Sequence, residues 1–478
     1  MTDAAHWIDG EPATFPDEAP RAVRSPFSGE VLARIPEGSP AAVDTAVNAA
    51  TRAFRAWRRV PLGERLAAVR AWLERVERER DTLERTLVAE VGKPIRAARS
   101  EVDSLLSSCR YLLAQAPGAI ADEEIPGYDR FTPRVTREPV GVVAAITPFN
   151  FPALLLAWKL CPAVLAGCTV VSKPDPRTPL ATAALARWAA EAGWPPGVFN
   201  VVHGDRDAGA GLVSHPGVAK VAFTGSVEAG RAVYESAAEG IRRVTLELGG
   251  CSALVVCRDG DFQGAMPQIL HRCFFNAGQY CFRVNRVLVE RSRHDALVAA
   301  LVAAASRLVV GDPREEGTDL GPLIDRPAFD EVVRRIEDAE ARGARVVLDG
   351  RRAARAGASL IGPTLVCDVP EDATLARSET FGPVVSVAPF HDLDEAIALA
   401  NDTEYGLAAF ALTADRATGA RLARDLEAGT VWVNALGESV PELPFGGVKQ
   451  SGIGVEKSRW AFEEYLQRKA VYFGFPKG

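Results

Sequence analysis

The sequence predicts an α/β fold made of two doubly wound domains, each with a parallel sheet. Near-continuous apolar runs such as VGVVAAI (140–146) alternate with segments of helical periodicity, as expected for parallel strands covered by helices on both faces. A second series of this kind begins at RVLVERS (286–292). A chain of 478 residues is also too long for one hydrophobic core, so two or more domains are expected.

The N-terminal part is predicted to be helical. Apolar residues recur at helical spacing over 43–57, after Ser39-Pro40 as N-cap and first-turn proline. A second, strongly charged helix continues the pattern over 66–76. The glycine and proline of EVGKP (90–94) are stop signals, so this helical region is expected to end there.

The first α/β series follows from about residue 140. Its predicted strands are 140–146, 169–173, 199–204, 220–225 and 243–248, and its predicted helices include 153–165 and 180–192. With the N-terminal helices this series is expected to form a dinucleotide-binding domain over 1–126 and 140–247.

The second series starts near the cysteine at 281. Its predicted helices are 293–308 and 327–342, and its further strands are 344–349, 384–390 and 430–435. We expect a catalytic domain over 248–440, with a cleft between the two domains, because ligand sites favour such interfaces.

Two segments fit neither domain. GYDRFTPRVTREP (127–139) alternates like an exposed hairpin, and the C-terminal segment 460–478 contains a terminal strand. Unsupported strands of this kind are often paired with a second chain. The sequence therefore predicts a small β arm for oligomerisation and a homodimer or homotetramer.

Composition excludes several classes of protein. A net charge of −7 leaves no basic excess for a nucleic-acid partner, and no apolar run is long enough to cross a membrane. The eight cysteines form no C-x-x-C pair and have no histidine at metal-ligand spacing, so neither a metal site nor a disulfide framework is predicted. A cytoplasmic protein is expected.

Cys281 in FFNAGQYCFRVNR (274–286) is either a buried apolar residue or a nucleophile at the mouth of a pocket. A nucleophilic cysteine needs thiolate character, an oxyanion stabiliser and, for hydrolysis, a base. Asn150 in TPFNFP ends a predicted strand and could donate to an oxyanion; it could equally be a turn asparagine. Glu247 ends the apolar run TLEL, where a carboxylate is costly to bury unless it has a role such as a base. A salt bridge is the alternative.

Two further segments carry weaker signals. SETFGP (378–383) places Glu379 before a tight Gly-Pro turn. FTGSVEAG (223–230) is a strand-to-helix turn with Gly225 and Ser226, and the N–H groups at such a helix start can bind a pyrophosphate. The common G-x-G-x-x-G fingerprint does not follow the first strand.

Taken together, these segments resemble the aldehyde dehydrogenase superfamily in the correct order over nearly the whole chain. The matching segments are TPFNFP, the KP pair at 173–174, FTGS, LELGG, NAGQYC, ETFGP and PFGGVKQSGIG (444–454). The resemblance implies an aldehyde dehydrogenase-like fold and NAD(P)-dependent oxidation of an aldehyde to the acid.

The resemblance also implies a role for each matching residue. Cys281 is the expected nucleophile, Asn150 the oxyanion donor together with the Cys281 N–H, and Glu247 the base that activates water. The expected cofactor-binding residues are Thr147, Phe149, Lys173, Gly225, Ser226, Glu379 and Phe381. Lys173 is expected at the adenosine ribose, Glu379 at the nicotinamide ribose and Phe381 near the nicotinamide ring.

One departure from the pattern concerns the choice of cofactor. In KPDPRTP (173–179), Pro176 stands where NAD-preferring relatives usually carry a ribose-binding glutamate. The absence of that carboxylate removes the main barrier to a 2′-phosphate, and Lys173 or Arg177 could attract one. Alternatively, Asp175 takes over the ribose contact, or Pro176 merely shapes the turn. We expect NADP to be accepted, with NAD also possible.

The substrate-pocket residues follow from the same resemblance. They are Phe151, Leu155, Trp158, Tyr280, Phe282 and Phe445. This mostly apolar and aromatic set favours an aromatic or aliphatic aldehyde, with a small phosphorylated or hydroxylated aldehyde as the alternative. Arg110 and Arg283 are candidate anion contacts but are expected to be surface or structural residues. His203 and His271 are expected to be structural.

Three other functions remain open at this point. A CoA-acylating aldehyde dehydrogenase generally lacks the glutamate of LELGG, so Glu247 counts against it. The same glutamate lowers the case for a reductase of acyl phosphates. A non-catalytic protein on this fold would have little reason to retain Cys281, Asn150, Glu247 and Glu379 together.

Overall fold

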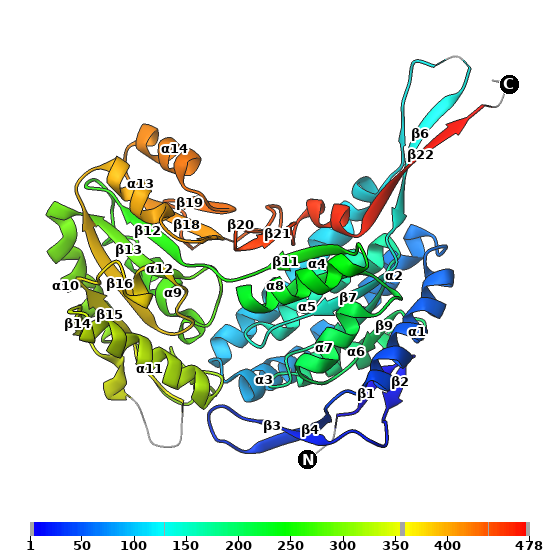
Figure 1. Ribbon diagram of the computed structural model, residues 1–478, viewed down its shortest axis with the longest axis horizontal. Coiled ribbons are helices and arrows are strands. Elements are labelled where there is room, and N and C mark those ends of the chain that lie inside the picture. Colours follow the sequence, from blue (N-terminus) through cyan, green and yellow to red (C-terminus); the bar gives the residue numbers. More distant parts are fainter. Residues whose placement is uncertain (1–3, 129, 354–358, 438, 475–478) are drawn as a thin grey trace.

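The computed structural model describes residues 4–128, 130–353, 359–437 and 439–474. Parts of the predicted ranges that fall on 1–3, 129, 354–358, 438 and 475–478 lie outside the described residues. Two α/β units form the body of the molecule, and a β arm projects from one of them (Figure 1).

The first unit is built on an eight-stranded sheet. Its five central strands run parallel, and the strands at both ends are antiparallel to their neighbours. In sheet order the strands are β2 (Glu11–Ala13), β1 (His6–Ile8), β9 (Phe199–Val201), β8 (Thr169–Lys173), β7 (Val142–Ile146), β10 (Val218–Thr224), β11 (Arg243–Glu247) and β21 (Gly452–Ile453). Alternate residues of β7 enter two separate apolar cores, Val143 on one face and Val142 on the other. This burial of both faces confirms the prediction of a doubly wound sheet.

Eight helices belong to the first unit within the described residues. They are α1 (Pro40–Trp57), α2 (Leu62–Arg78), α3 (Arg80–Val91), α4 (Ile95–Ile120), α5 (Pro152–Ala166), α6 (Leu180–Glu191), α7 (Arg206–Ser214) and α8 (Val227–Glu239). Ser39 caps α1 by accepting a hydrogen bond from the N–H of Ala42, and left-handed Gly92 ends α3, as predicted. The helical region does not end at EVGKP, however: α4 begins directly after it and runs for 26 residues.

The second unit is built on a seven-stranded sheet in which only the edge strand β14 is antiparallel. In sheet order the strands are β14 (Arg345–Leu348), β15 (Thr364–Cys367), β16 (Val384–Phe390), β13 (Val284–Glu290), β12 (Ser252–Val256), β18 (Ala408–Leu412) and β19 (Thr430–Val433). Its helices are α9 (Met266–Phe274), α10 (His294–Ala305), α11 (Arg326–Ala341), α12 (Thr374–Arg377), α13 (Leu393–Asn401) and α14 (Arg416–Asp425). Short 3₁₀ helices are η1 (Phe275–Gly278), η2 (Arg291–Arg293) and η3 (Gly350–Ala353).

This second sheet begins earlier than the sequence predicted. β12 precedes the cysteine segment, pairs with β13 and β18 and is fully buried, whereas the second series was expected to start near Cys281. β15 and β18 were also not predicted. All three strands are four- or five-residue apolar runs, and so short a run does not by itself distinguish a strand from a buried helix segment.

The arm is a three-stranded sheet in the order β22 (Leu466–Phe473), β6 (Thr132–Pro139) and β5 (Glu123–Glu124). β6 is a single strand whose whole length pairs antiparallel with β22, so 127–139 is not a self-contained hairpin. The predicted C-terminal strand is present as β22, and the 3₁₀ helix η4 (Arg459–Glu464) precedes it. The arm stands away from the body at the upper right of Figure 1.

Two small pairs of strands complete the fold. β3 (Pro20–Arg24) pairs with β4 (Val31–Pro36), and β17 (Tyr405–Gly406) pairs with β20 (Val448–Lys449). Among the helices of the described residues, none has the length and apolar character needed to span a bilayer.

Candidate active site

The carboxyl ends of the parallel strands bring the predicted cofactor residues to one edge of the first sheet. Thr147 follows β7 and donates its N–H to the carbonyl of Lys173, the last residue of β8, at 3.2 Å. Gly225 follows β10 and donates its N–H to the carbonyl of Glu247 at the end of β11, at 3.1 Å. Ligands of open parallel sheets bind at this edge, so these residues are in position to contact a nucleotide.

Three features of this edge suit a dinucleotide. The Thr147 hydroxyl is buried and has no hydrogen-bond partner among the described residues. The Lys173 amino group is held by the carbonyls of Pro174 and Gly204 at 3.0 and 2.9 Å, which fixes its direction. Ser226 caps α8 by accepting a hydrogen bond from the N–H of Ala229, so an N-terminus that can bind a phosphate opens beside Gly225.

The residues around Pro176 are engaged with one another. Arg177 donates to both carboxylate oxygens of Asp175, at 2.9 and 2.8 Å, and to Asp325 at 2.7 Å. Its guanidinium also lies 4.5 Å from the ring centre of Phe149. Asp175 and Arg177, which the sequence offered as ribose and phosphate contacts, therefore pair with each other. Asp325 is the N-cap of α11, so this pair also joins the two α/β units.

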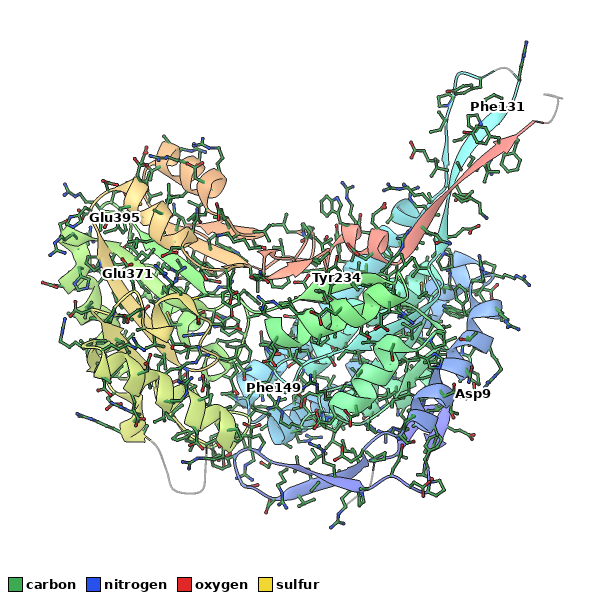
Figure 2. All side chains as sticks on the ribbon, viewed as in Figure 1. Asp9, Phe131, Phe149, Tyr234, Glu371 and Glu395 are labelled. Atoms are coloured by element: carbon green, nitrogen blue, oxygen red, sulfur yellow. The ribbon has the colours of Figure 1, made fainter. Side chains whose placement is uncertain are left out.

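Phe149 of the first α/β unit packs against Phe381 of the second. Their ring centres are 5.8 Å apart in an edge-to-face arrangement. In Figure 2, Phe149 lies where the two α/β units face each other. Phe149 therefore contacts Arg177 and Phe381, and this packing holds the turn that carries Asn150.

A strained turn presents Cys281. Asn276, Ala277 and Gly278 have φ values of 52°, 54° and 74°, and three successive left-handed residues turn the chain sharply at η1. A side chain at Gly278 would collide with the carbonyl of Gly382, so the turn packs backbone to backbone against the FGP segment. Cys281 emerges from this turn partly exposed.

Asn150 lies beside this turn. Its side-chain amide donates to the carbonyl of Gln279 at 3.1 Å, two residues before Cys281. The amide of Asn276 donates to the same carbonyl at 3.2 Å and to the Asn150 carbonyl at 3.4 Å. An amide NH₂ has two protons, so one proton of Asn150 holds the loop and the other is available to a substrate oxygen.

Paired glycines bring Glu379 and Cys281 to the end of β11. The N–H of Gly250 donates to the Glu379 carboxylate at 3.2 Å, and a Cβ on Gly250 would lie 2.6 Å from the Cys281 carbonyl. Only a glycine allows that approach. Burial raises the pKa of Glu379 to about 7, against the opposing effects of the Gly250 N–H and of Arg283 and Arg335.

Glu247 is a buried carboxylate without hydrogen bonds. The residue is 3 % exposed, and neither carboxylate oxygen has a hydrogen-bond partner among the described residues. Burial raises the pKa of Glu247 well above its ordinary value; Glu456 raises it further and Lys159 lowers it. Glu247 is therefore a candidate general base and not half of a salt bridge.

The sequence patterns did not predict a role for Lys159 or Glu456. Lys159 on α5 donates to Glu456 at 2.5 Å and to the Thr224 hydroxyl at 2.6 Å, and both charged groups are buried. The pair extends the polar surroundings of Glu247 into the protein. The available signal was a single lysine in the otherwise apolar helix ALLLAWKLCPAVLA, where a charge needs a partner.

The surroundings of Cys281 favour its thiol form over the thiolate. Burial of its sulfur raises its pKa most, and the charges of Glu379 and Glu247 raise it further. The N–H groups of Cys281 and Phe282 oppose this shift because they stabilise the thiolate. The nucleophilic form therefore becomes more populated as the pH rises, and a neighbouring base is needed at neutral pH.

Phe282, the residue after the cysteine, belongs to a row of packed aromatic rings. Phe282 lies 5.3 Å from Phe445, and Phe445 lies 5.6 Å from Trp158, measured between ring centres. Phe151 stacks on Phe275 at 6.2 Å, whereas Leu155 is buried within α5.

Tyr280 has a different environment from the other predicted pocket residues. It is buried, and its hydroxyl donates a hydrogen bond to the carbonyl of Arg272 at 2.8 Å. Its ring packs edge to face against Phe282, with 5.1 Å between the ring centres.

The remaining polar candidates are engaged elsewhere. Arg283 is buried and donates to the carbonyls of Cys273, Thr380 and Val384, and Arg110 pairs with Glu77 at the surface. Within the described ranges, no group of three or more His, Cys, Asp or Glu side chains could hold a metal ion.

A two-sheet α/β chain that gathers a cysteine, an amide and an unpaired carboxylate next to a dinucleotide-type sheet edge belongs to the class of NAD(P)-dependent oxidoreductases. Residues 15–471 match the sequence model of the aldehyde dehydrogenase family. The chain belongs to the aldehyde dehydrogenase family. It is an NAD(P)-dependent enzyme that oxidises an aldehyde to the carboxylic acid.

Two relatives and one solved structure illustrate the similarity. A betaine aldehyde dehydrogenase of Cereibacter sphaeroides is 39 % identical over 472 residues, 98 % of this chain and 97 % of the relative. A succinate-semialdehyde dehydrogenase (NADP(+)) of Escherichia coli is 39 % identical over 470 residues, 98 % of this chain and 96 % of the relative. The crystal structure of betaine aldehyde dehydrogenase from Staphylococcus aureus in complex with NAD+ superimposes with a TM-score of 0.95 at 32 % identity, covering 99 % of this chain and 95 % of the other.

Proposed function

We propose that the chain oxidises its aldehyde through a covalent intermediate on Cys281. The thiolate attacks the carbonyl carbon, and the carbonyl oxygen becomes an oxyanion that accepts hydrogen bonds from the Asn150 amide and the Cys281 N–H. A nicotinamide held near Phe381 and Glu379 would supply hydride acceptance, the chemistry that oxidises the thiohemiacetal on Cys281 to a thioester. The Asn150 amide donates to the carbonyl of Gln279, two residues before Cys281. This contact supports a shared role for the Asn150 amide and the Cys281 N–H.

In the second half of the reaction Glu247 accepts a proton from water, the water attacks the thioester, and the acid leaves as Cys281 is released. The observation that carries this proposal is the unpaired, buried Glu247, whose charge also raises the pKa of Cys281. Product analysis tests hydrolysis directly: with CoA added, we expect the free acid, and accumulation of an acyl-CoA would favour a CoA-acylating enzyme.

Replacing Asn150 by alanine is expected to lower kcat by about 10²- to 10³-fold, the usual effect of losing one oxyanion donor. KM for the aldehyde should change much less, because the hydrogen bond strengthens only as the oxyanion forms. Initial rates of cofactor reduction measure both constants. Turnover equal to that of the unmodified enzyme, in a variant with an unchanged Tm, would contradict the assignment.

For the substrate, we propose an aldehyde with an apolar carbon skeleton, either aromatic or aliphatic. The rings of Trp158, Phe282 and Phe445 beside the nucleophile support this, since apolar surface binds apolar groups. The names of the two relatives, for betaine aldehyde and succinate semialdehyde, refer to substrates of opposite charge. Family membership therefore does not decide the charge of this substrate.

For the cofactor, we propose that the enzyme accepts NADP as well as NAD. Pro176 carries no charge, and the carboxylate of Asp175 is already paired with Arg177, so no free carboxylate opposes a 2′-phosphate at these positions. Lys173 is the cation that faces the sheet edge from β8.

Replacing Pro176 by glutamate is expected to lower the ratio of kcat/KM with NADP to kcat/KM with NAD by about tenfold or more, because like charges repel. Pro176→Gln is the matched control for size without charge and should change that ratio much less. Both ratios follow from the absorbance of the reduced cofactor. A preference of the unmodified enzyme for NAD of about a thousandfold or more would contradict this proposal.

We also propose that the arm pairs with a second copy of the chain in a homodimer or homotetramer. Phe131 lies on the arm, away from the body (Figure 2), and its ring packs 5.0 Å from Tyr128 and 5.5 Å from Tyr472. Tyr128 and Tyr472 are both exposed in the single chain. Exposed aromatic residues on an open sheet favour a partner.

The eight free cysteines support a reducing compartment such as the cytoplasm.

The domain limits are proposed as well: a dinucleotide-binding domain over 1–126 and 140–247, a catalytic domain over 248–440, and arm strands within 127–139 and 460–478. Each limit falls close to a change of sheet.

A further inference from the structure

Lys457 stands in a backbone conformation that lysine rarely adopts. It lies between β21 and η4 with φ +63°, and Ser458 follows with φ +57°. Left-handed backbone is unfavourable for any residue with a side chain, and glycine is the usual occupant. Strain of this kind in a non-glycine residue often marks a functional position. A lysine at this place therefore needs a reason.

The ammonium group of Lys457 is buried without a carboxylate partner. The residue is 7 % exposed, and its Nζ donates a hydrogen bond to the hydroxyl of Ser439 at 3.2 Å. Across the described part of the chain, no carboxylate oxygen lies within 4.0 Å of that nitrogen. Burial lowers the pKa of Lys457 to about 8; Glu442 raises it and Arg272 lowers it. The group is still mostly charged at neutral pH, and an ammonium has three protons to donate.

A row of aromatic rings connects Lys457 to the nucleophile. Its Nζ lies 6.0 Å from the centre of the Trp158 ring. From Trp158 the row continues through Phe445 to Phe282, the residue after Cys281. Ser439, at the other side of Lys457, is exposed. A row of packed aromatic rings therefore lies between the ammonium and the residue that follows the reactive cysteine.

We propose that Lys457, assisted by the Ser439 hydroxyl, binds a carboxylate at the far end of the aldehyde substrate. The inference rests on the proposed function, because it assigns the opposite end of the molecule whose aldehyde Cys281 attacks. A substrate carboxylate would supply the counter-charge that the described residues do not place beside this ammonium. One lysine and one hydroxyl suit a singly charged carboxylate better than a phosphate, which usually recruits arginine or several N–H groups. The substrate class is an ω-carboxylated aldehyde with an apolar chain or ring between its ends.

Two pairs of aldehydes matched in shape test this proposal: 4-carboxybenzaldehyde with 4-methylbenzaldehyde, and 6-oxohexanoate with hexanal. The measured quantity is the ratio of kcat/KM for the carboxylated member to kcat/KM for the neutral member. We expect a ratio above one in the unmodified enzyme for at least one pair. Lys457→Met should lower that ratio by about ten- to hundredfold, mainly through KM, as expected for the loss of hydrogen bonds to a charged group.

Two further variants separate recognition from folding. Lys457→Arg keeps the charge and should retain part of the preference. Lys449→Met is the matched control: Lys449 is an exposed lysine with φ +53° that pairs with Glu427, so its loss should leave the ratio unchanged. A thermal melt of each variant identifies one that fails to fold.

The pH dependence of the unmodified enzyme gives a test without mutation. The ammonium is present below the pKa of Lys457, about 8, and is lost above it. The charged groups that act on it are Glu442 and Arg272. The preference for the carboxylated member should therefore fall as the pH rises from about 7 to about 9.

The outcomes distinguish the two proposals. If all four aldehydes are oxidised and the ratios are the same with Lys457 and with methionine, the carboxylate site is wrong while the covalent mechanism stands. If the unmodified enzyme prefers both neutral members, the site is also wrong. If none of the four is oxidised, the proposed function and the carboxylate site fail together.

Discussion

Replacing Cys281 by serine is expected to lower kcat for aldehyde oxidation by about 10⁴-fold or more, the scale seen when a hydrolytic enzyme loses its nucleophile. A serine hydroxyl ionises far less readily than a thiol, and among the described residues no histidine acts on Cys281 to activate it. The surroundings make the loss more severe, because burial and the charges of Glu379 and Glu247 already oppose a negative charge at this position. Absorbance of the reduced cofactor measures the steady-state rate.

Cys251→Ser is the control for this variant. Cys251 is a buried thiol on the other side of Gly250, and burial raises its pKa as well, so a general effect of losing a thiol near the site would appear there. We expect the control to keep activity within about tenfold of the unmodified enzyme. A serine variant at 281 that keeps more than about one per cent of the activity would show that Cys281 is not the nucleophile.

The reactivity of the thiol gives the sign of the pH effect. Because the pKa of Cys281 is raised, the thiolate is scarce at neutral pH and increases as the pH rises. Alkylation by iodoacetamide in the absence of cofactor should therefore accelerate toward alkaline pH. Glu379→Gln should make alkylation faster at a given pH, because it removes one of the charges that oppose the thiolate.

Replacing Glu247 by glutamine is expected to lower the steady-state rate by about 10²- to 10⁴-fold, the usual contribution of a general base. The first turnover should be affected less. The acyl group forms on Cys281 with release of one equivalent of reduced cofactor, and then waits for a water that glutamine cannot deprotonate. Rapid mixing should show a burst followed by slow turnover, and the mass of the acid-quenched protein should increase by that of the acyl group.

The pH profile supplies a second measurement for Glu247. Its pKa is raised, so the carboxyl is protonated at low pH and the base appears only as the pH rises. In the unmodified enzyme kcat should increase with pH through that transition, and the glutamine variant should lack this limb.

Glu84→Gln is the control, since Glu84 is another buried glutamate with an oxygen that has no hydrogen bond among the described residues, and it lies in α3. We expect it to turn over at nearly the normal rate. If the first turnover of the Glu247 variant slows as much as the steady state, Glu247 acts before hydrolysis and the assignment is wrong.

Most elements of the fold could be predicted from local patterns. The parallel strands β7, β8, β10 and β11 and the helices α1 and α5 lie within a few residues of their predicted limits, because burial on both faces leaves a continuous apolar run in the sequence. Local patterns did not predict β12 or α4, and the two reasons differ. β12 is a short apolar run between two glycine-rich segments, and α4 follows a proline that opens a helix rather than closing one.

The positions of the site residues were predictable to a similar degree, since Thr147, Lys173, Gly225 and Glu247 all follow apolar strands that must end at one sheet edge. Local sequence alone determined most of the elements, their strand ends and the motifs that point to the aldehyde dehydrogenase family. Only the tertiary structure decided what the charged groups do. Arg177 meets an aspartate 148 positions away, and Lys159 meets a glutamate 297 positions away. Lys457 faces a tryptophan on α5 from the far end of the chain. Such contacts arise from the packing of distant segments, and a periodic pattern along the chain contains no information about which segments will pack together.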